Sequence, residues 1–108
     1  MQRVIGVGGI FFKAKDPKLL YQWYEKHLGL KRAPHGGCVE IPWPRPEQKG
    51  LTAFAIFPKD TEYFNPSNSS FMLNFCVAKD PKREDYDYGR FAWIMDPEGN
   101  RIELWEPR

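Results

Sequence analysis

A five-residue segment, Ala-Lys-Asp-Pro-Lys, occurs twice in the chain, at Ala14–Lys18 and at Ala78–Lys82. Each copy follows a largely apolar run, residues 8–13 in the first case and Phe71–Val77 in the second. Aspartate accepts hydrogen bonds from the free N–H groups at a helix start, and proline suits the first helical position. The repeat therefore marks equivalent points, after a strand, in two related halves.

Only the first copy is followed by the pattern of a helix. Apolar and aromatic side chains recur there at three- and four-residue spacing, and Gly29 is a natural residue just past a helix end. These observations predict a helix over residues 17–28. Its packed stripe is expected to comprise Leu20, Trp23, Tyr24, His27 and Leu28.

The second copy lacks such a stripe. Residues 79–88 contain Asp85, Asp87 and two tyrosines, which are poor helix formers. As a helix these ten residues would span only about 15 Å, too little to cross a sheet and return along a strand. We therefore predict a linker without a helix in this half.

Short β-rich runs separated by glycine, proline and polar segments predict the rest of the fold. Pro-Trp-Pro-Arg-Pro after Ile41 cannot lie inside a sheet, and Asp-Pro-Glu-Gly-Asn at 96–100 predicts a tight turn. The expected strands are residues 4–12, 31–34, 38–42, 51–57, 71–77, 90–96 and 101–106.

Composition limits the classes of function. A length of 108 residues suits one domain, and 42% hydrophobic residues suffice for a packed core. The net charge of +2 comes from interspersed charges without a basic stripe, so we expect no nucleic-acid partner. No apolar run reaches the ~20 residues of a membrane span. Cys38 and Cys76 form no disulfide framework, and free thiols indicate the reducing cytoplasm.

Two long stretches resemble the vicinal-oxygen-chelate superfamily, which includes glyoxalase I, bleomycin-resistance proteins and extradiol dioxygenases. They are GGIFFKAKDPKLLYQWYEKHLGL near the start and YGRFAWIMDPEGNRIELWEPR at the end. The resemblance implies an α+β fold of paired βαβββ modules around a half-open barrel. Residues 1–58 would form a complete module, 59–70 a linker loop, and 71–108 a second module that lacks its helix, within a single domain.

Enzymes of this superfamily usually hold a divalent metal with side chains from both modules. The matching positions here are Gly9, a site within Leu51–Phe57 that has no ligating side chain, Met72, and Glu103. Glu103 alone matches, and a divalent ion normally needs three or more protein ligands. We therefore expect no metal and no cofactor. Glu103 can instead pair with Arg90 or Arg101.

Strand alternation assigns one set of side chains to the face that lines the barrel in this superfamily. Its aromatic and polar members suit a small, partly apolar ligand, although they also suit a plain core. Binding without catalysis is therefore the first hypothesis. The alternatives are a metal-dependent lyase, isomerase or dioxygenase with displaced ligands, and a structural domain without a ligand. The expected ligand-binding residues are Phe11, Met72, Asn74, Glu103 and Trp105, beside Gly9.

The missing helix leaves the opposite face of the second module without its usual cover. Exposure of several large apolar side chains would forfeit roughly 1.5–3 kcal/mol each. We therefore expect a homo-oligomer, most simply a dimer. Its linker either runs extended over its own sheet or, as we favour, carries residues 90–108 into the partner's sheet as a strand swap. The side chains expected on this face are Leu73, Phe75, Val77, Ile102 and Leu104.

Overall fold

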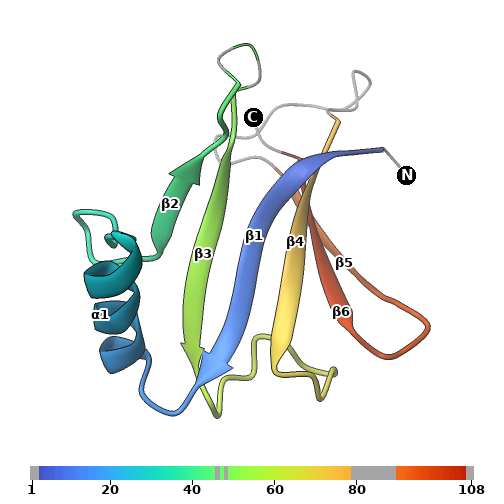
Figure 1. Cartoon of the computed structure of the whole chain (residues 1–108). Helices are drawn as coiled ribbons and strands as arrows, with labels where there is room; N and C mark the ends of the chain where they lie inside the picture. The colour runs from blue at the N-terminus through green and yellow to red at the C-terminus, as the bar shows by residue number, and fades with distance from the viewer. Residues whose placement is uncertain (1–2, 46, 48, 79–89, 107–108) are drawn as a thin grey trace.

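The computed structural model describes residues 3–45, 47, 49–78 and 90–106. They form one six-stranded mixed sheet with a single helix on one side (Figure 1). The linker expected without a helix, residues 79–88, lies outside the described residues. The strand order is β2-β3-β1-β4-β6-β5. In chain order the elements are β1 (Val4–Ala14), α1 (Pro17–Leu28), β2 (Val39–Pro42), β3 (Leu51–Pro58), β4 (Phe71–Val77), β5 (Arg90–Met95) and β6 (Arg101–Glu106).

The sheet consists of two halves with the same pattern of pairing. In the first half β1 runs parallel to β3, which pairs antiparallel with β2; in the second, β4 runs parallel to β6, which pairs antiparallel with β5. The halves meet where β1 and β4 pair antiparallel. This is the paired-module α+β architecture that the repeated segment predicts, with the helix present in the first half.

One detail of the sheet differs from the sequence-based expectation. The strand expected at 31–34 is reduced to an isolated bridge between Arg32 and Val39, because Pro34 and a turn that ends in a hydrogen bond from Gly36 N to Ala33 O (2.8 Å) interrupt it. In the second half the described residues form the three expected strands, and only β6 separates β4 from β5.

Helix α1 begins and ends as expected but packs through a different residue. Asp16 accepts a hydrogen bond from Leu19 N (3.1 Å), and Gly29 ends the helix with a left-handed backbone (φ 70°). Its one buried residue is Tyr21, whose hydroxyl also accepts a hydrogen bond from Ile56 N (2.9 Å). Trp23 is 50% exposed, so the predicted packed stripe is displaced by part of a turn. His27 and Leu28 are likewise exposed, and His27 rests against the Trp23 ring.

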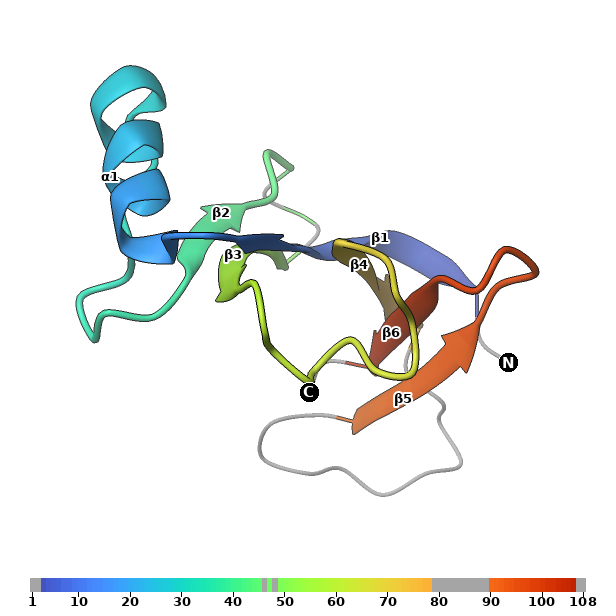
Figure 2. The same cartoon turned by 90° about the horizontal axis from the view of Figure 1, so that it is seen from below.

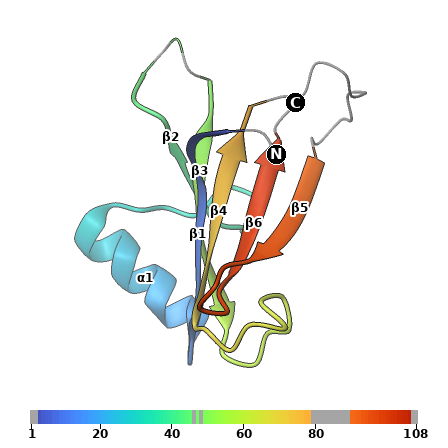
Figure 3. The same cartoon turned by 90° about the vertical axis from the view of Figure 1, so that its right-hand side faces the viewer.

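The two faces of the sheet are covered differently. Helix α1 lies on one face over the first half, and the loop between β3 and β4 lies on the other, which we call the concave face (Figures 2 and 3). In this loop Phe64 is completely buried against Phe11 and Met72. The core is therefore divided into a cluster beneath α1 around Tyr21 and Phe54 and a second cluster beneath the loop.

The helix-side face of the second half has no helix over it among the described residues. Ile10 of β1, Leu73, Ile102 and Ile94 form one row across four neighbouring strands. Ile10 and Ile94 are 39% and 37% exposed, whereas the inner pair is half-buried by its strand neighbours. Phe75 and Leu104 are also half-buried, but Val77, expected on this bare face, is buried.

No helix formed by the described residues is both long enough and apolar enough to cross a membrane.

Candidate functional site

A buried carboxylate lies at the centre of the concave face. Glu103 is 2% exposed and occupies the middle of β6. The strand registers place Gly9, Asn74, Glu103 and Trp93 in one row across β1, β4, β6 and β5. The alternation of these strands turns their side chains to the side opposite the row that begins at Ile10. Side chains from three strands therefore converge on Glu103.

Three uncharged donors hold the two oxygens of this carboxylate. Asn74 Nδ2 donates to Oε1 (2.5 Å), and Trp93 Nε1 donates to Oε2 (2.8 Å). The Tyr63 hydroxyl, from the loop between β3 and β4, donates to the same Oε2. We call Tyr63, Asn74, Trp93 and Glu103 the Glu103 cluster. A buried carboxylate is tolerated only when such donors replace its lost water, and here both of its oxygens accept hydrogen bonds from the protein.

The expected pairing of Glu103 with an arginine does not occur at Arg101. Arg101 Nη1 donates instead to the Tyr63 carbonyl oxygen (2.7 Å), and its guanidinium lies over the Trp93 ring at 5.0 Å from the centroid. The hairpin register places Arg90 opposite Glu106 rather than Glu103. Arg101 thus contacts two of the three residues that donate to Glu103, Tyr63 and Trp93, rather than the carboxylate.

Burial and the neighbouring carboxylate act on Tyr63. Loss of water around the phenol, followed by its hydrogen bond to Glu103, raises the pKa of Tyr63 well above its usual value near 10. The phenol therefore stays protonated and serves as a donor across the ordinary pH range. Its ring stacks on Phe57 with centroids 5.5 Å apart, which fixes the direction of the hydroxyl.

Two buried polar atoms beside the cluster have no hydrogen-bond partner. They are Asn74 Oδ1 and Trp105 Nε1, one acceptor and one donor. The bond from Asn74 Nδ2 to Glu103 fixes the orientation of the amide, so its oxygen must face away from the carboxylate. A Cβ on Gly8 would collide with that oxygen and lie 3.1 Å from the Trp105 ring. An unpaired buried polar atom is costly and marks a position where a bound molecule can form the missing bond.

The expected ligand-binding residues all line the concave face, but they do not share one environment. Phe11 and Met72 lie beneath Phe64 of the loop and belong to the core. Asn74 and Glu103 belong to the Glu103 cluster, and Trp105 is half-buried beside it, stacked on Phe91 at 6.0 Å. Phe64 of the loop thus fills the part of the concave face over β3, β1 and β4 and leaves the part over β6 and β5.

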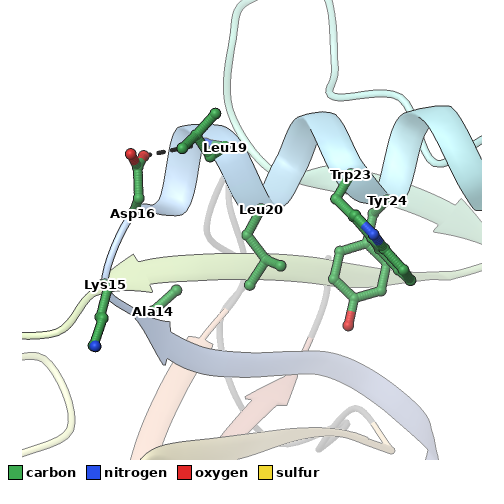
Figure 4. A pocket seen from close by; sticks show the side chains of 7 residues that line it. All are labelled: Ala14, Lys15, Asp16, Leu19, Leu20, Trp23 and Tyr24. Atoms are coloured by element: carbon green, nitrogen blue, oxygen red, sulfur yellow. Dashed lines mark hydrogen bonds between the residues drawn. The ribbon is translucent and has the colours of Figure 1, made fainter.

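The described residues line hollows on opposite sides of the sheet, of which two bear on function. A small one of about 190 Å³ adjoins the Glu103 cluster and is lined by Pro66, Trp93, Ile94, Met95 and Arg101. A wider groove of about 510 Å³ lies on the other side, between α1 and the end of β1 (Figure 4). Only the first contacts residues of the concave face.

The concave face does not fit the metal centre that the superfamily resemblance implies. At Gly9 a Cβ would lie 2.6 Å from the Phe11 ring, so no ligating side chain has room there. Met72, at another expected position, is buried in the core. Within residues 3–45, 47, 49–78 and 90–106, no group of three or more His, Cys, Asp or Glu side chains could hold a metal ion.

Comparison with known proteins supports the fold. A crystal structure of methylmalonyl-CoA epimerase from Mycobacterium tuberculosis matches over the whole of this chain and 91% of its own, with a TM-score of 0.50 and 18% sequence identity. The chain has a glyoxalase-like fold. At this identity the likeness is one of fold alone. No family model and no curated protein sequence matches the chain.

Two members of the Glu103 cluster were not expected from the sequence. Trp93 follows from the tight turn at 96–100, since pairing Met95 with Arg101 across that turn places Trp93 opposite Glu103. Tyr63 gives no such signal, because it lies in an irregular loop 40 residues before Glu103. Only packing of the loop against the concave face brings the two together.

Proposed function

We propose that this protein binds a small, partly apolar ligand on its concave face, beside the Glu103 cluster, without a bound metal. The main support is the pair of unpartnered polar atoms, Asn74 Oδ1 and Trp105 Nε1, next to aromatic walls. A ligand with an aromatic face, one hydrogen-bond donor and one acceptor could form the missing hydrogen bond to each of these atoms. The hollow of about 190 Å³ beside Trp93, whose lining does not include Asn74 or Trp105, has room for a ligand the size of a single ring with a polar substituent.

Catalysis has less support than binding. Burial raises the pKa of the Cys76 thiol to about 11, so this buried cysteine is protonated and a poor nucleophile. Both oxygens of Glu103 already accept hydrogen bonds, which leaves the carboxylate poorly placed to take a proton from a substrate. We therefore propose a binding role. The two free thiols, Cys38 and Cys76, support a reducing compartment, and we place the protein in the cytoplasm.

Benzamide is a suitable probe, because its ring, N–H group and carbonyl match the proposed ligand. The chain has four tryptophans, each with one indole N–H signal in a nitrogen–proton correlation spectrum. Millimolar benzamide is expected to shift the signals of Trp93 and Trp105. Trp23, on α1, and Trp43, whose Nε1 donates to Val7 O (3.2 Å), should not move. Unchanged Trp93 and Trp105 signals would contradict the proposal.

A pair of variants tests the role of the amide. Asn74→Leu removes the unpartnered oxygen and is expected to weaken benzamide binding at least tenfold. Asn68→Leu, at an exposed asparagine of the loop, is the matched control and should bind as the parent protein does. The Trp23 and Trp43 signals report whether each variant keeps its fold.

A structural role without a ligand is the second candidate, and the position of Phe64 favours it. This side chain is completely buried and fills the concave face over β1 and β3. Phe64→Ala is expected to lower the free energy of unfolding by about 3–5 kcal/mol. A purely structural plug predicts that loss with no benzamide response in either protein. The binding proposal predicts the same loss with the Trp105 response retained.

A further inference from the structure

The side of the sheet that carries α1 presents two apolar surfaces. One is an outer flank of α1, formed by Leu19 (61% exposed) and Trp23 (50%), and the other is the part of the sheet that no described residue covers. A groove of about 510 Å³ lies between α1 and the end of β1, and Figure 4 shows Leu20, Trp23 and Tyr24 along it. The exposed side chains of the uncovered part are Val7 and Ile10 of β1, Phe71 of β4 and Ile94 of β5.

The two surfaces are complementary within one pairing of chains. The repeated sheet pattern provides two equivalent faces for a helix, yet α1 covers only the first. Each chain therefore has one uncovered half and one helix with an unused apolar flank. A twofold axis would place the α1 flank of each copy on the uncovered part of the other's sheet. Both apolar surfaces would then be buried in both copies.

The area of these surfaces agrees with what a dimer needs. Six apolar side chains, each 37–61% exposed, contribute about 80–100 Å² apiece, since a large apolar side chain presents roughly 150–250 Å² in full. The sum is about 500 Å² from each copy and about 1,000 Å² in total, which reaches the size of a specific interface. An apolar area of about 500 Å² is within the range of the largest patch on a typical monomer, and such patches are often functional.

We propose that these surfaces form a symmetric dimer interface, in which the Leu19–Trp23 flank of α1 packs on the uncovered face of β1, β4, β6 and β5 of a second copy. The contact places Trp23 of each chain over the row that contains Ile94. It lies on the side of the sheet opposite the Glu103 cluster, and Ile94 is the residue it shares with the lining of the hollow beside Trp93.

The mass in solution is the first test. The chain weighs 12.7 kDa, and sedimentation equilibrium is expected to show twice that mass. A monodisperse monomer at micromolar concentration would overturn the proposal. Trp23→Lys is expected to weaken dimerisation at least tenfold, because it places a charge in an apolar contact. Gln22→Lys, at the preceding exposed position of α1, is the matched control and should leave the dimer intact.

A charge-swap experiment tests the relative position of helix and sheet. Trp23→Lys and Ile94→Glu are each expected to give monomers, and an equimolar mixture is expected to recover a heterodimer. In that heterodimer one contact pairs lysine with glutamate, while the other keeps both native side chains. A mixture that stays monomeric would overturn the proposed contact. A dimer that persists in both single variants would also overturn it, and that result is the one a strand swap predicts. Circular dichroism checks the fold of each variant, and Leu19→Lys provides a second flank variant.

Discussion

Tyr63 and Glu103 lie 40 residues apart and are joined by a hydrogen bond from the phenol to the buried carboxylate. One comes from an irregular loop and the other from the middle of β6. This bond fastens the loop between β3 and β4 to β6 in the second half of the sheet, whereas Phe64 of the same loop is buried where the halves meet, against Phe11 of β1 and Met72 of β4. The loop therefore couples the two halves on the concave face.

Removal of the phenol oxygen should weaken that coupling. Tyr63→Phe is expected to lower the free energy of unfolding by about 1–2 kcal/mol, because a partly exposed hydrogen bond to a charged group is lost. Urea denaturation measures the change. Tyr24→Phe is the matched control, since that ring packs against Phe12 and Phe54. An equal loss in both variants would show that the phenol of Tyr63 has no particular role.

The same residue predicts a dependence on alkaline pH. The pKa of Tyr63 in the folded protein is raised by burial and by Glu103. The unfolded chain therefore releases this proton first, and the stability that Tyr63 contributes is complete below about pH 10 and declines above it. The stability difference between the parent protein and Tyr63→Phe should shrink from pH 9 to pH 11. A constant difference over this interval would contradict the raised pKa.

Two substitutions at Glu103 should differ sharply in how much they lower the free energy of unfolding. Glu103→Leu leaves the donors of Tyr63, Asn74 and Trp93 without an acceptor, and is expected to cost about 3–5 kcal/mol. Glu103→Gln keeps one oxygen that can accept hydrogen bonds from Tyr63 and Trp93. Its new N–H group can donate to Asn74 Oδ1 if the Asn74 amide rotates by half a turn. Its expected cost is therefore below about 1.5 kcal/mol. Thermal or urea unfolding of both variants tests this, and equal costs would refute the rotation.

Divalent metals are expected to leave the protein unchanged. A metal that binds only the folded state raises the unfolding midpoint. Saturating Zn²⁺, Mn²⁺ or Ni²⁺ should not do so here, because Glu103 belongs to no group of three or more His, Cys, Asp or Glu side chains among the described residues. Glu103→Gln provides the comparison. A rise in midpoint that occurs in the parent protein and vanishes in this variant would identify a metal site.

Local signals explain which parts of the fold are predictable. Asp16 and Gly29 mark the ends of α1, and the prediction of residues 17–28 is confirmed. The centre of its buried face is not predictable, because Tyr21 is fixed by the hydrogen bond that its hydroxyl accepts from Ile56 N on β3. That contact depends on how the helix lies on the sheet, which the spacing of apolar residues along the helix cannot predict.

The candidate site is likewise predictable only where local sequence patterns determine it. Strand alternation places Asn74, Glu103 and Trp105 correctly on one face, since a two-residue period needs no knowledge of neighbouring strands. It also places Phe11 and Met72 there, but cannot reveal that Phe64 covers them. Loop residues have no period, so the contribution of Tyr63 to the Glu103 cluster depends on tertiary contacts alone.

The central position of β1 has a consequence for how the chain folds. This first strand pairs with β3 and with β4, so Gly9 meets Ala53 on one side and Asn74 on the other. Neither neighbour exists until long after β1 has been synthesised, and no local hairpin can shelter it in the meantime. Because its contacts are so distant in sequence, folding should be slow for a domain of this size, on the scale of milliseconds to seconds. A nascent chain that stops before residue 71 would leave one edge of β1 open to pairing with other chains.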